Sequence, residues 1–333
     1  GGSGSGGSSS SKMSSLIEDV RREVFTYTNL VHAISGMTGG VTAISTFYPL
    51  NIIRIRLQVD EQLKSQSALS VARKIVKEGG IEALYQGWWS SVVSLGASNF
   101  VYFYTYNAFK TVYKKLIAQN PKAAIDPITN LVIASTAGVI NVLATTPLWV
   151  VGTRLSMQSK KADIERPYNG VADALTRIAS EEGIAALWKG VGPSLVLVSN
   201  PSIQFVTYER LRGPMARIAE KRGSPISAFE FFVMGAIAKA VATVFTYPLQ
   251  LAQSRLRADK GKAGNAKERN YNSTADVLRK VYKEQGALGW FKGMEAKLWQ
   301  TVLTAAFQFL TYEQVQKVVF SLLVRNKVEA ASV

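Results

Sequence analysis

Residues 47–58 read FYPLNIIRIRLQ, a stretch in which an apolar run ends in a proline that is followed by two arginines. Pro49 removes a backbone hydrogen bond and distorts a helix. Arg54 and Arg56 place positive charge at the end of the same run. A proline and two arginines are unusual at the end of a segment suited to lipid, and the rest of the chain shows that a proline followed by arginine recurs.

The stretch closes the first of six long segments that are almost free of charge. Residues 24–53 contain no Asp, Glu, Lys or Arg over 30 positions, and a bilayer core needs roughly 20 apolar residues of helix. Several segments also carry Ser, Thr, Asn and Gln, which suits helices with one face on lipid and another on water or protein. The remaining five segments are 88–109, 127–153, 191–208, 231–254 (interrupted only by Lys239) and 298–312.

Composition narrows the chemistry of the 333 residues. The net charge of +16 could serve nucleic acid, an anionic membrane surface or small anionic substrates, and the apolar segments argue against nucleic acid as the main partner. The chain has no cysteine and a single histidine, His32, which suits a structural position better than a catalytic one. We therefore predict no enzyme activity, no cofactor and no metal site.

The chain repeats itself at intervals of about 100 residues. Pro49, Pro147 and Pro248 begin the related stretches PLNIIRIR, PLWVVGTR and PLQLAQSR. Each unit later contains a short amphipathic segment, KEGGIEALYQGW, SEEGIAALWKG or KEQGALGWFKG. This pattern predicts a tandem unit of two spanning helices joined by a surface helix, and parallel repeats suggest a central pathway. We divide the chain into 1–12 (an engineered Gly/Ser linker), 13–27 (N-terminal segment), repeats at 28–120, 121–221 and 222–325, and a tail at 326–333.

These motifs resemble the signature of the mitochondrial carrier family, Px[DE]xx[KR]x[KR] followed by [DE]Gxxxx[WYF][KR]G, and the resemblance covers residues 29–325. It implies an all-α membrane protein with six tilted transmembrane helices and three short surface helices around a central cavity. It also implies alternating access through a gate on each side of the membrane. In the family the prolines kink the odd-numbered helices so that their ends converge, and Arg54 would then point toward the axis.

Further stretches indicate a branch of that family. PLWVV, with Trp149 in the acidic slot, is similar to the members that carry NAD, FAD and folate. With SNFVYFYTYNAFK, SNPSIQF, YPLQLAQS and GMEAKLWQTVLTAA, the chain resembles animal carriers of CoA, FAD, NAD and adenine nucleotides in the peroxisomal membrane. We therefore expect a peroxisomal, multi-pass, monomeric exchanger of these anions, with the bilayer and peroxisomal membrane-insertion factors as partners. The alternatives are an inner-mitochondrial carrier of another nucleotide-like anion and a basic membrane scaffold that transports nothing.

The proline motifs lack the acids that close the gate in typical members. The acidic slots hold Asn51, Trp149 and Gln250, so a ring of ion pairs is excluded. Hydrogen bonds among polar side chains would then have to close the gate, and each is worth about 1 kcal/mol net. The resemblance therefore predicts a gate that is weaker than usual in the family. The basic slots hold Arg54, Gly152 and Gln253.

On the other side the family places [FY][DE]xx[KR] near the ends of the even-numbered helices. Pairing each acid with the base of the next helix predicts an ion pair between Glu313 and Lys110. Ordinary interfacial charge at helix ends is the alternative. The other predicted links of this second gate are Asn107–Arg212 and Glu209–Gln316.

The resemblance places the central cargo contacts at Ser94, Leu197 and Gln300. Lys239 is the only charge in its segment and precedes Gln250 by 11 residues, three helical turns, so both should face the cavity. With Arg54 and Lys297 it would bind phosphate, unless it extends to the membrane surface. Positions on the same faces are Ser91, Ser98, Ser194, Gln204 and Thr304, and the aromatic residues that could either stack on cargo or anchor the helices are Tyr102, Tyr104, Tyr106 and Trp299.

Overall fold

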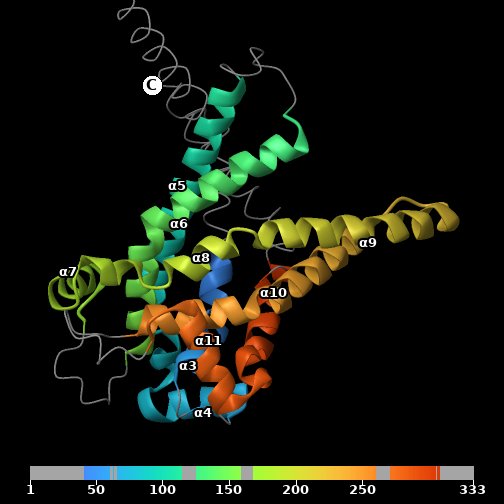
Figure 1. Ribbon diagram of the computed structural model, residues 1–333. Helices are drawn as coiled ribbons and strands as arrows, with labels where there is room; N and C mark the ends of the chain where they lie inside the picture. Colours follow the sequence, from blue (N-terminus) through green and yellow to red (C-terminus); the bar gives the residue numbers. More distant parts are fainter. Residues whose placement is uncertain are drawn as a thin grey trace, which may run out of the picture.

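The computed structural model describes residues 41–60, 63, 66–114, 125–158, 168–259, 271–304 and 306–307, and these residues form helices and turns without a strand (Figure 1). Each repeat has a long helix that bears the proline motif, then a short surface helix, a 3-10 turn and further long helices. The predicted all-α architecture of three carrier repeats is thereby confirmed.

The elements follow the same order in each repeat. Repeat 1 contains α3 (Tyr48–Val59), α4 (Ala68–Gly79), η2 (Ile81–Tyr85) and α5 (Trp88–Val112). Repeat 2 contains α6 (Pro127–Met157), α7 (Val171–Glu181), η4 (Ile184–Trp188), α8 (Val191–Leu197) and α9 (Asn200–Arg222). Repeat 3 contains α10 (Ala228–Ala258), α11 (Thr274–Gln285), η6 (Ala287–Phe291) and helical residues 294–304.

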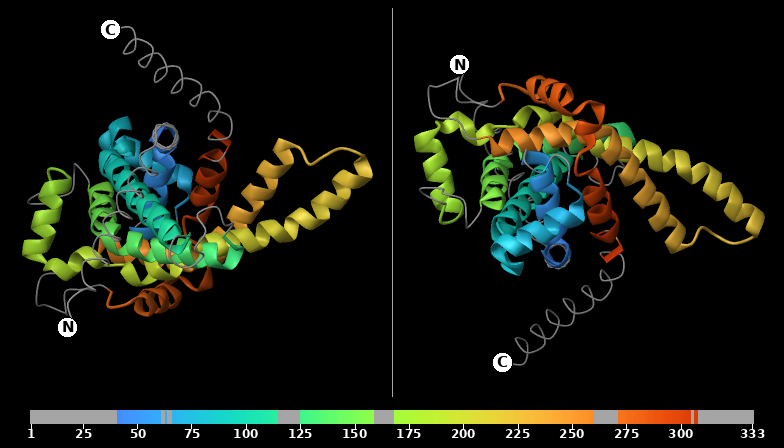
Figure 2. Two further views of the ribbon diagram at one scale, coloured as in Figure 1. Left: turned by 90° about the horizontal axis from the view of Figure 1, so that it is seen from above. Right: turned by 90° about the horizontal axis from the view of Figure 1, so that it is seen from below.

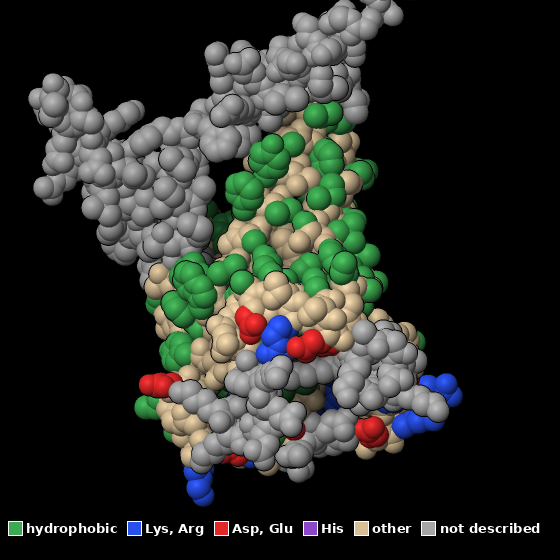
Figure 3. All heavy atoms as spheres, turned by 90° about the vertical axis from the view of Figure 1, so that its left-hand side faces the viewer, with side chains coloured by type: hydrophobic (Ala, Val, Ile, Leu, Met, Phe, Trp, Pro, Cys, Tyr) green, Lys and Arg blue, Asp and Glu red, His purple; other side chains and the backbone are tan. Residues whose placement is uncertain are grey.

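Helices α6 and α10 are long enough to cross a bilayer. Each has 31 residues, which is about 46 Å of helix at 1.5 Å per residue, against a hydrocarbon core of about 30 Å. Within the described ranges these are the two helices that satisfy both the length and the apolar composition of a membrane span. Apolar side chains cover the upper part of the face in Figure 3, and charged side chains gather at its lower end, as expected of a membrane protein.

The fourth predicted span differs from expectation, because residues 191–208 do not form one continuous helix. Helix α8 ends at Leu197 and α9 begins at Asn200. Pro201 has no N–H to donate to the carbonyl of Leu197, so the chain turns through Val198 and Ser199 instead. From this break α9 pairs with the first part of α10, and the two project together from the body of the molecule (Figures 1 and 2).

The surface helices show why the short segments after each proline motif fold as they do. Each buries two apolar residues four positions apart on one face. In α4 these are Val71 and Ile75, both at most 2% exposed, and they pack on Leu57 and neighbouring residues of α3. The corresponding pairs are Ala174 and Ile178 in α7 and Val277 and Val281 in α11.

Three glycines join the repeats into a ring. Gly87, Gly190 and Gly293, which end the three surface motifs, all have positive φ angles of 73°, 81° and 78°. Each lies against the proline-bearing helix of the next repeat, where a Cβ atom would stand 2.7 Å from Ser156 Oγ, 3.1 Å from the Gln253 carbonyl oxygen and 3.3 Å from Leu57 Cβ, respectively. Glycine is therefore required twice over, for backbone conformation and for close approach. We name these contacts the 1–2, 2–3 and 3–1 junctions, and the side of the bundle on which they lie the proline side.

Candidate functional site

A cluster of cations lies between repeats 1 and 3. Lys297, in the helix after Gly293, interacts electrostatically with Arg54 of α3 and Lys239 of α10. Arg257, near the end of α10, also interacts with Arg54. We call Arg54, Lys239, Lys297 and Arg257 the cation cluster. Arg54, Lys239 and Lys297 were predicted as a group of cations for a phosphate-bearing cargo, whereas Arg257 was not predicted.

The cation cluster has little internal compensation. Arg54 donates a 2.7 Å hydrogen bond to the neutral Asn51 Oδ1 on its own helix. Its Nε atom is buried without a hydrogen-bond partner in the described part of the chain. The ion pairs of the described residues involve no member of the cluster. Among the described residues these four positive charges have no ion-paired carboxylate, and such an arrangement suits an anion, because like charges held together are unfavourable until a counter-charge binds.

One buried acceptor lies beside these donors. Gln300 is one helical turn beyond Lys297, and its Oε1 atom is buried without a hydrogen-bond partner among the described residues. A buried amide oxygen without a donor is costly. The neighbourhood therefore suits a molecule that carries both phosphate oxygens and N–H or O–H donors.

The serines of α5 lie elsewhere than predicted. Ser91 and Ser94 are only 7% and 1% exposed, so they do not line open space in this conformation. Ser94 donates 2.7 and 3.1 Å hydrogen bonds to the carbonyls of Ser90 and Leu148, and Ser98 bonds with Asn141 at 2.9 Å. Helical spacing placed these serines on one face of α5, as predicted for the cavity, but in this structure Ser94 and Ser98 meet α6. Three other predicted cargo contacts are half-buried: Leu197, Gln204 and Thr304.

The aromatic residues were predicted either to stack on cargo or to anchor the helices in the membrane, and their surroundings differ. Tyr104 and Trp299 are 52% and 59% exposed, which suits contact with lipid. The rings of Tyr102 and Tyr106 stack with centroids 6.1 Å apart, and the Tyr106 hydroxyl donates a 2.6 Å bond to Asn130 Oδ1 on α6.

On the proline side, the predicted network among Asn51, Arg54, Gln250 and Gln253 forms only in part. The Arg54–Asn51 bond is present, but Gln253 donates to Ser194 Oγ at 2.7 Å and Gln250 donates to Thr246 Oγ1 at 3.1 Å. Gly152 lies against α5, where a Cβ would be 3.5 Å from Ser94 Oγ. Gln253 thus bonds across to α8, and Gln250 bonds within α10.

Two tyrosines that were not predicted from the sequence also connect the repeats on this side. Tyr247 accepts a 2.9 Å hydrogen bond from Gln58 Nε2 and donates one of 2.8 Å to the Lys292 carbonyl. The Tyr48 hydroxyl lies 3.2 Å from Ser156 Oγ and donates to the Gln86 carbonyl at 2.9 Å. The repeated Tyr-Pro dipeptide, at 48–49 and 247–248, is the sequence signal that could have identified them.

Trp149 contacts an arginine of the next repeat. The guanidinium of Arg257 lies 5.8 Å from the centroid of the Trp149 ring, and Arg257 Nη2 donates a 3.2 Å bond to Ser194 Oγ. Trp149 occupies the acidic slot of repeat 2, so a cation–π contact is present where typical members have an ion pair.

The second gate is not closed by the residues that the structure describes. Arg212 lies 3.6 Å from Glu209 of its own helix, with both side chains well exposed, and Lys110 lies over the ring of Tyr106, also on its own helix. The predicted link from Arg212 to Asn107 is thus replaced by a local pair, because α5 and α9 run in different directions (Figure 1). Glu313 and Gln316 lie outside the described residues.

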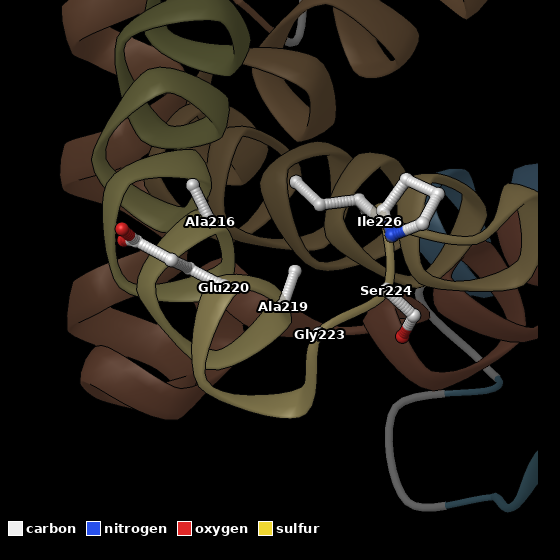
Figure 4. Close-up of a pocket in the computed structure, with 7 residues that line it drawn as sticks. Ala216, Ala219, Glu220, Gly223, Ser224 and Ile226 are labelled. Atoms are coloured by element: carbon white, nitrogen blue, oxygen red, sulfur yellow. The ribbon is translucent and has the colours of Figure 1, made fainter.

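A separate groove of about 410 Å³ lies at the turn between α9 and α10 (Figure 4). Its lining comes entirely from residues 216–226, and Glu220 is its only charged side chain. An acidic lining does not suit an anion, so this groove is not a cargo site.

The chain matches the family described as mitochondrial carrier protein three times, over residues 25–116, 124–217 and 224–322. Together with the threefold fold, this places the chain in the mitochondrial carrier family, whose members are transporters, and the predicted family resemblance is confirmed.

Individual relatives include several peroxisomal proteins. Peroxisomal membrane protein PMP34 of Mus musculus is 45% identical over 307 residues, covering 90% of this chain and 96% of the relative. The peroxisomal nicotinamide adenine dinucleotide carrier of Arabidopsis thaliana is 33% identical, covering 86% and 95%. Peroxisomal membrane protein PMP47B of Candida boidinii is 27% identical, covering 86% of both chains. These relatives support the predicted multi-pass protein of the peroxisomal membrane.

Proposed function

We propose that this carrier exchanges CoA, FAD, NAD or adenine nucleotides across the peroxisomal membrane by alternating access. The observation that carries the proposal is the cation cluster, in which Lys297 lies within electrostatic reach of both Arg54 and Lys239 and no carboxylate forms an ion pair with any of them among the described residues. Phosphate and pyrophosphate groups supply the missing negative charge through charge-assisted hydrogen bonds.

The neutral groups beside the cluster favour a nucleotide over a simple anion. Gln300 offers a buried acceptor, which inorganic phosphate in its fully ionised form could not satisfy, whereas a ribose hydroxyl or an adenine amino group could. Relatives named as carriers of nicotinamide adenine dinucleotide support the same class of cargo.

The proposal is tested by reconstituting the purified protein in liposomes loaded with one candidate cargo and following uptake of a labelled cargo from outside. CoA, FAD, NAD, AMP and ADP are the candidate cargoes. The controls are inorganic phosphate as the cargo and liposomes that contain no cargo. We expect counter-exchange of at least one nucleotide-containing cargo and little uptake into empty liposomes. A folded protein that exchanges none of them would contradict the proposal.

A further inference from the structure

The three junctions on the proline side differ in the hydrogen bonds and ion pairs that connect the repeats. Each repeat has an arginine seven residues after its proline. Arg154 donates from Nε to the Arg257 carbonyl at 3.2 Å and from Nη2 to the Asp259 carbonyl at 2.8 Å, which crosses the 2–3 junction. Arg255 donates to the Gln58 carbonyl at 2.8 Å, which crosses the 3–1 junction. The Nε atom of Arg56, at the 1–2 junction, is buried and has no hydrogen-bond partner in the described part of the chain.

The 2–3 junction also has a buried ionic cluster. Lys189 Nζ donates a 2.8 Å bond to the Asp259 carbonyl and lies 3.6 Å from its carboxylate and 3.3 Å from Glu182. Glu182 also pairs with Arg154. The side chains of Arg154 and Asp259 are 0% and 1% exposed, so salt screens these contacts weakly. Two cations thus cap the C-terminal end of α10, where the carbonyl dipoles favour positive charge.

The 1–2 junction cannot form this cluster. Glutamine occupies the position of the lysine, and the two acidic positions hold glycine and glutamine. The bonds that join repeat 1 to α6 near this junction are neutral: the Tyr48 hydroxyl lies 3.2 Å from Ser156 Oγ, and Ser94 Oγ donates to the Leu148 carbonyl at 3.1 Å. Neutral bonds are about half as strong as charge-assisted ones. The positions equivalent to Glu182, Lys189 and Asp259 are Gly79, Gln86 and Gln158 at the 1–2 junction, and Gln285, Lys292 and Asp60 at the 3–1 junction.

We propose that the proline side opens first at the 1–2 junction, while repeats 2 and 3 move as one joined body. Opening there would separate α5 from α6 and expose Ser91 and Ser94, which are buried in the closed arrangement. Those hydroxyls then become a polar wall for cargo opposite the cation cluster, a consequence that rests on the proposed function. The order of opening itself does not depend on it.

The absence of cysteine allows a direct test with single introduced thiols. Ser91 and Ser194 are equivalent, each the fourth residue after the glycine at its junction, and are 7% and 3% exposed. We would measure alkylation of Ser91→Cys and Ser194→Cys by a soluble maleimide in lipid vesicles without cargo. The Ser91→Cys thiol should react at least about ten-fold faster, the ratio that one charge-assisted hydrogen bond implies.

Matched variants exchange the residues of the ionic cluster between the 2–3 and 1–2 junctions. Lys189→Gln gives repeat 2 the residue that repeat 1 has, and should raise alkylation of Ser194→Cys about ten-fold without changing that of Ser91→Cys. The pair Gln86→Lys with Gln158→Asp supplies the missing ions at the 1–2 junction and should slow alkylation of Ser91→Cys. Gln86→Lys alone, without its acid, should do less.

Equal rates at the two thiols, or equal acceleration of both by Lys189→Gln, would overturn the proposal. Circular dichroism verifies the helical content, and if Lys189→Gln does not fold, the two thiols in the parent chain still decide the question. Because no cargo is added, a negative result here leaves nucleotide exchange untouched. Failure to exchange nucleotides likewise leaves the comparison of thiols valid.

Discussion

At the scale of single residues, the environment of Arg54 controls the charge that the site offers to cargo. Arg54 bonds to the neutral Asn51 at 2.7 Å, so Asn51→Asp would place a carboxylate on it. We expect the half-saturation concentration for an anionic cargo to rise at least about ten-fold, since one charge-assisted contact is worth on the order of 1.5–3 kcal/mol. Asn51→Ala is the control and should retain affinity. Equal affinity of the Asp variant and the parent in counter-exchange would show that Arg54 does not contact cargo.

A second residue-scale prediction concerns the glycines of the junctions. Gly190 (φ 81°) lies against the Gln253 carbonyl, whereas Gly223 (φ 71°) ends α9 with nothing within 4 Å of a Cβ. Alanine strains the backbone at both positions, but only Gly190→Ala also crowds the 2–3 junction, at a further cost of about 1–3 kcal/mol. Thermal unfolding should therefore occur at a lower temperature for Gly190→Ala than for Gly223→Ala. Matching melting curves would mean that the close approach contributes nothing to stability.

At the scale of elements, the Tyr247 hydroxyl joins α10 both to α3 and to the turn before Gly293. Tyr247→Phe removes the partner of the buried Gln58 Nε2, which should lower the free energy of unfolding by about 1–3 kcal/mol. The control is Tyr282→Phe on α11, where the side chain is 54% exposed. Chemical denaturation in detergent compares the two variants with the parent. Equal stability of Tyr247→Phe and the parent would show that the Tyr247 hydroxyl contributes nothing to the contact between α10 and α3.

The sequence indicated the elements well because their signals are local and occur three times. Pro49, Pro147 and Pro248 mark equivalent positions, and Gly87 and Gly190 mark where the surface motifs end. Lys239 was selected because an isolated charge in an apolar segment must face away from lipid. Lys297 was selected because it shares a helical face with Gln300.

Contacts between elements could not be predicted in the same way. The partners Gln58 and Tyr247 are 189 residues apart in the chain, and no local pattern pairs them. Helical spacing shows that Ser91 and Ser94 share a face of α5, but spacing alone cannot say whether such a face meets a neighbouring helix or open water. Here it meets α6.

At the scale of the whole molecule, the two sides of the carrier are in different states. The proline side is held by inter-repeat contacts through Gly87, Gly190 and Gly293, whereas the described residues of the second gate pair within their own helices. The cation cluster draws its members from repeats 1 and 3. Cargo bound there would therefore join the first and last repeats, and would do so next to the helix ends that must separate for transport.

The most direct measurement of this account compares counter-exchange of labelled CoA, NAD or AMP by Lys239→Ala and by the parent protein in liposomes. Lys283→Ala, on the exposed face of α11, is the matched control, and circular dichroism confirms folding. We predict that Lys239→Ala loses roughly ten-fold to over a hundred-fold in affinity, the equivalent of one charge-assisted phosphate contact, while Lys283→Ala matches the parent. A folded Lys239→Ala protein that transports with the rate and affinity of the parent would contradict the assignment of the cation cluster as the cargo site.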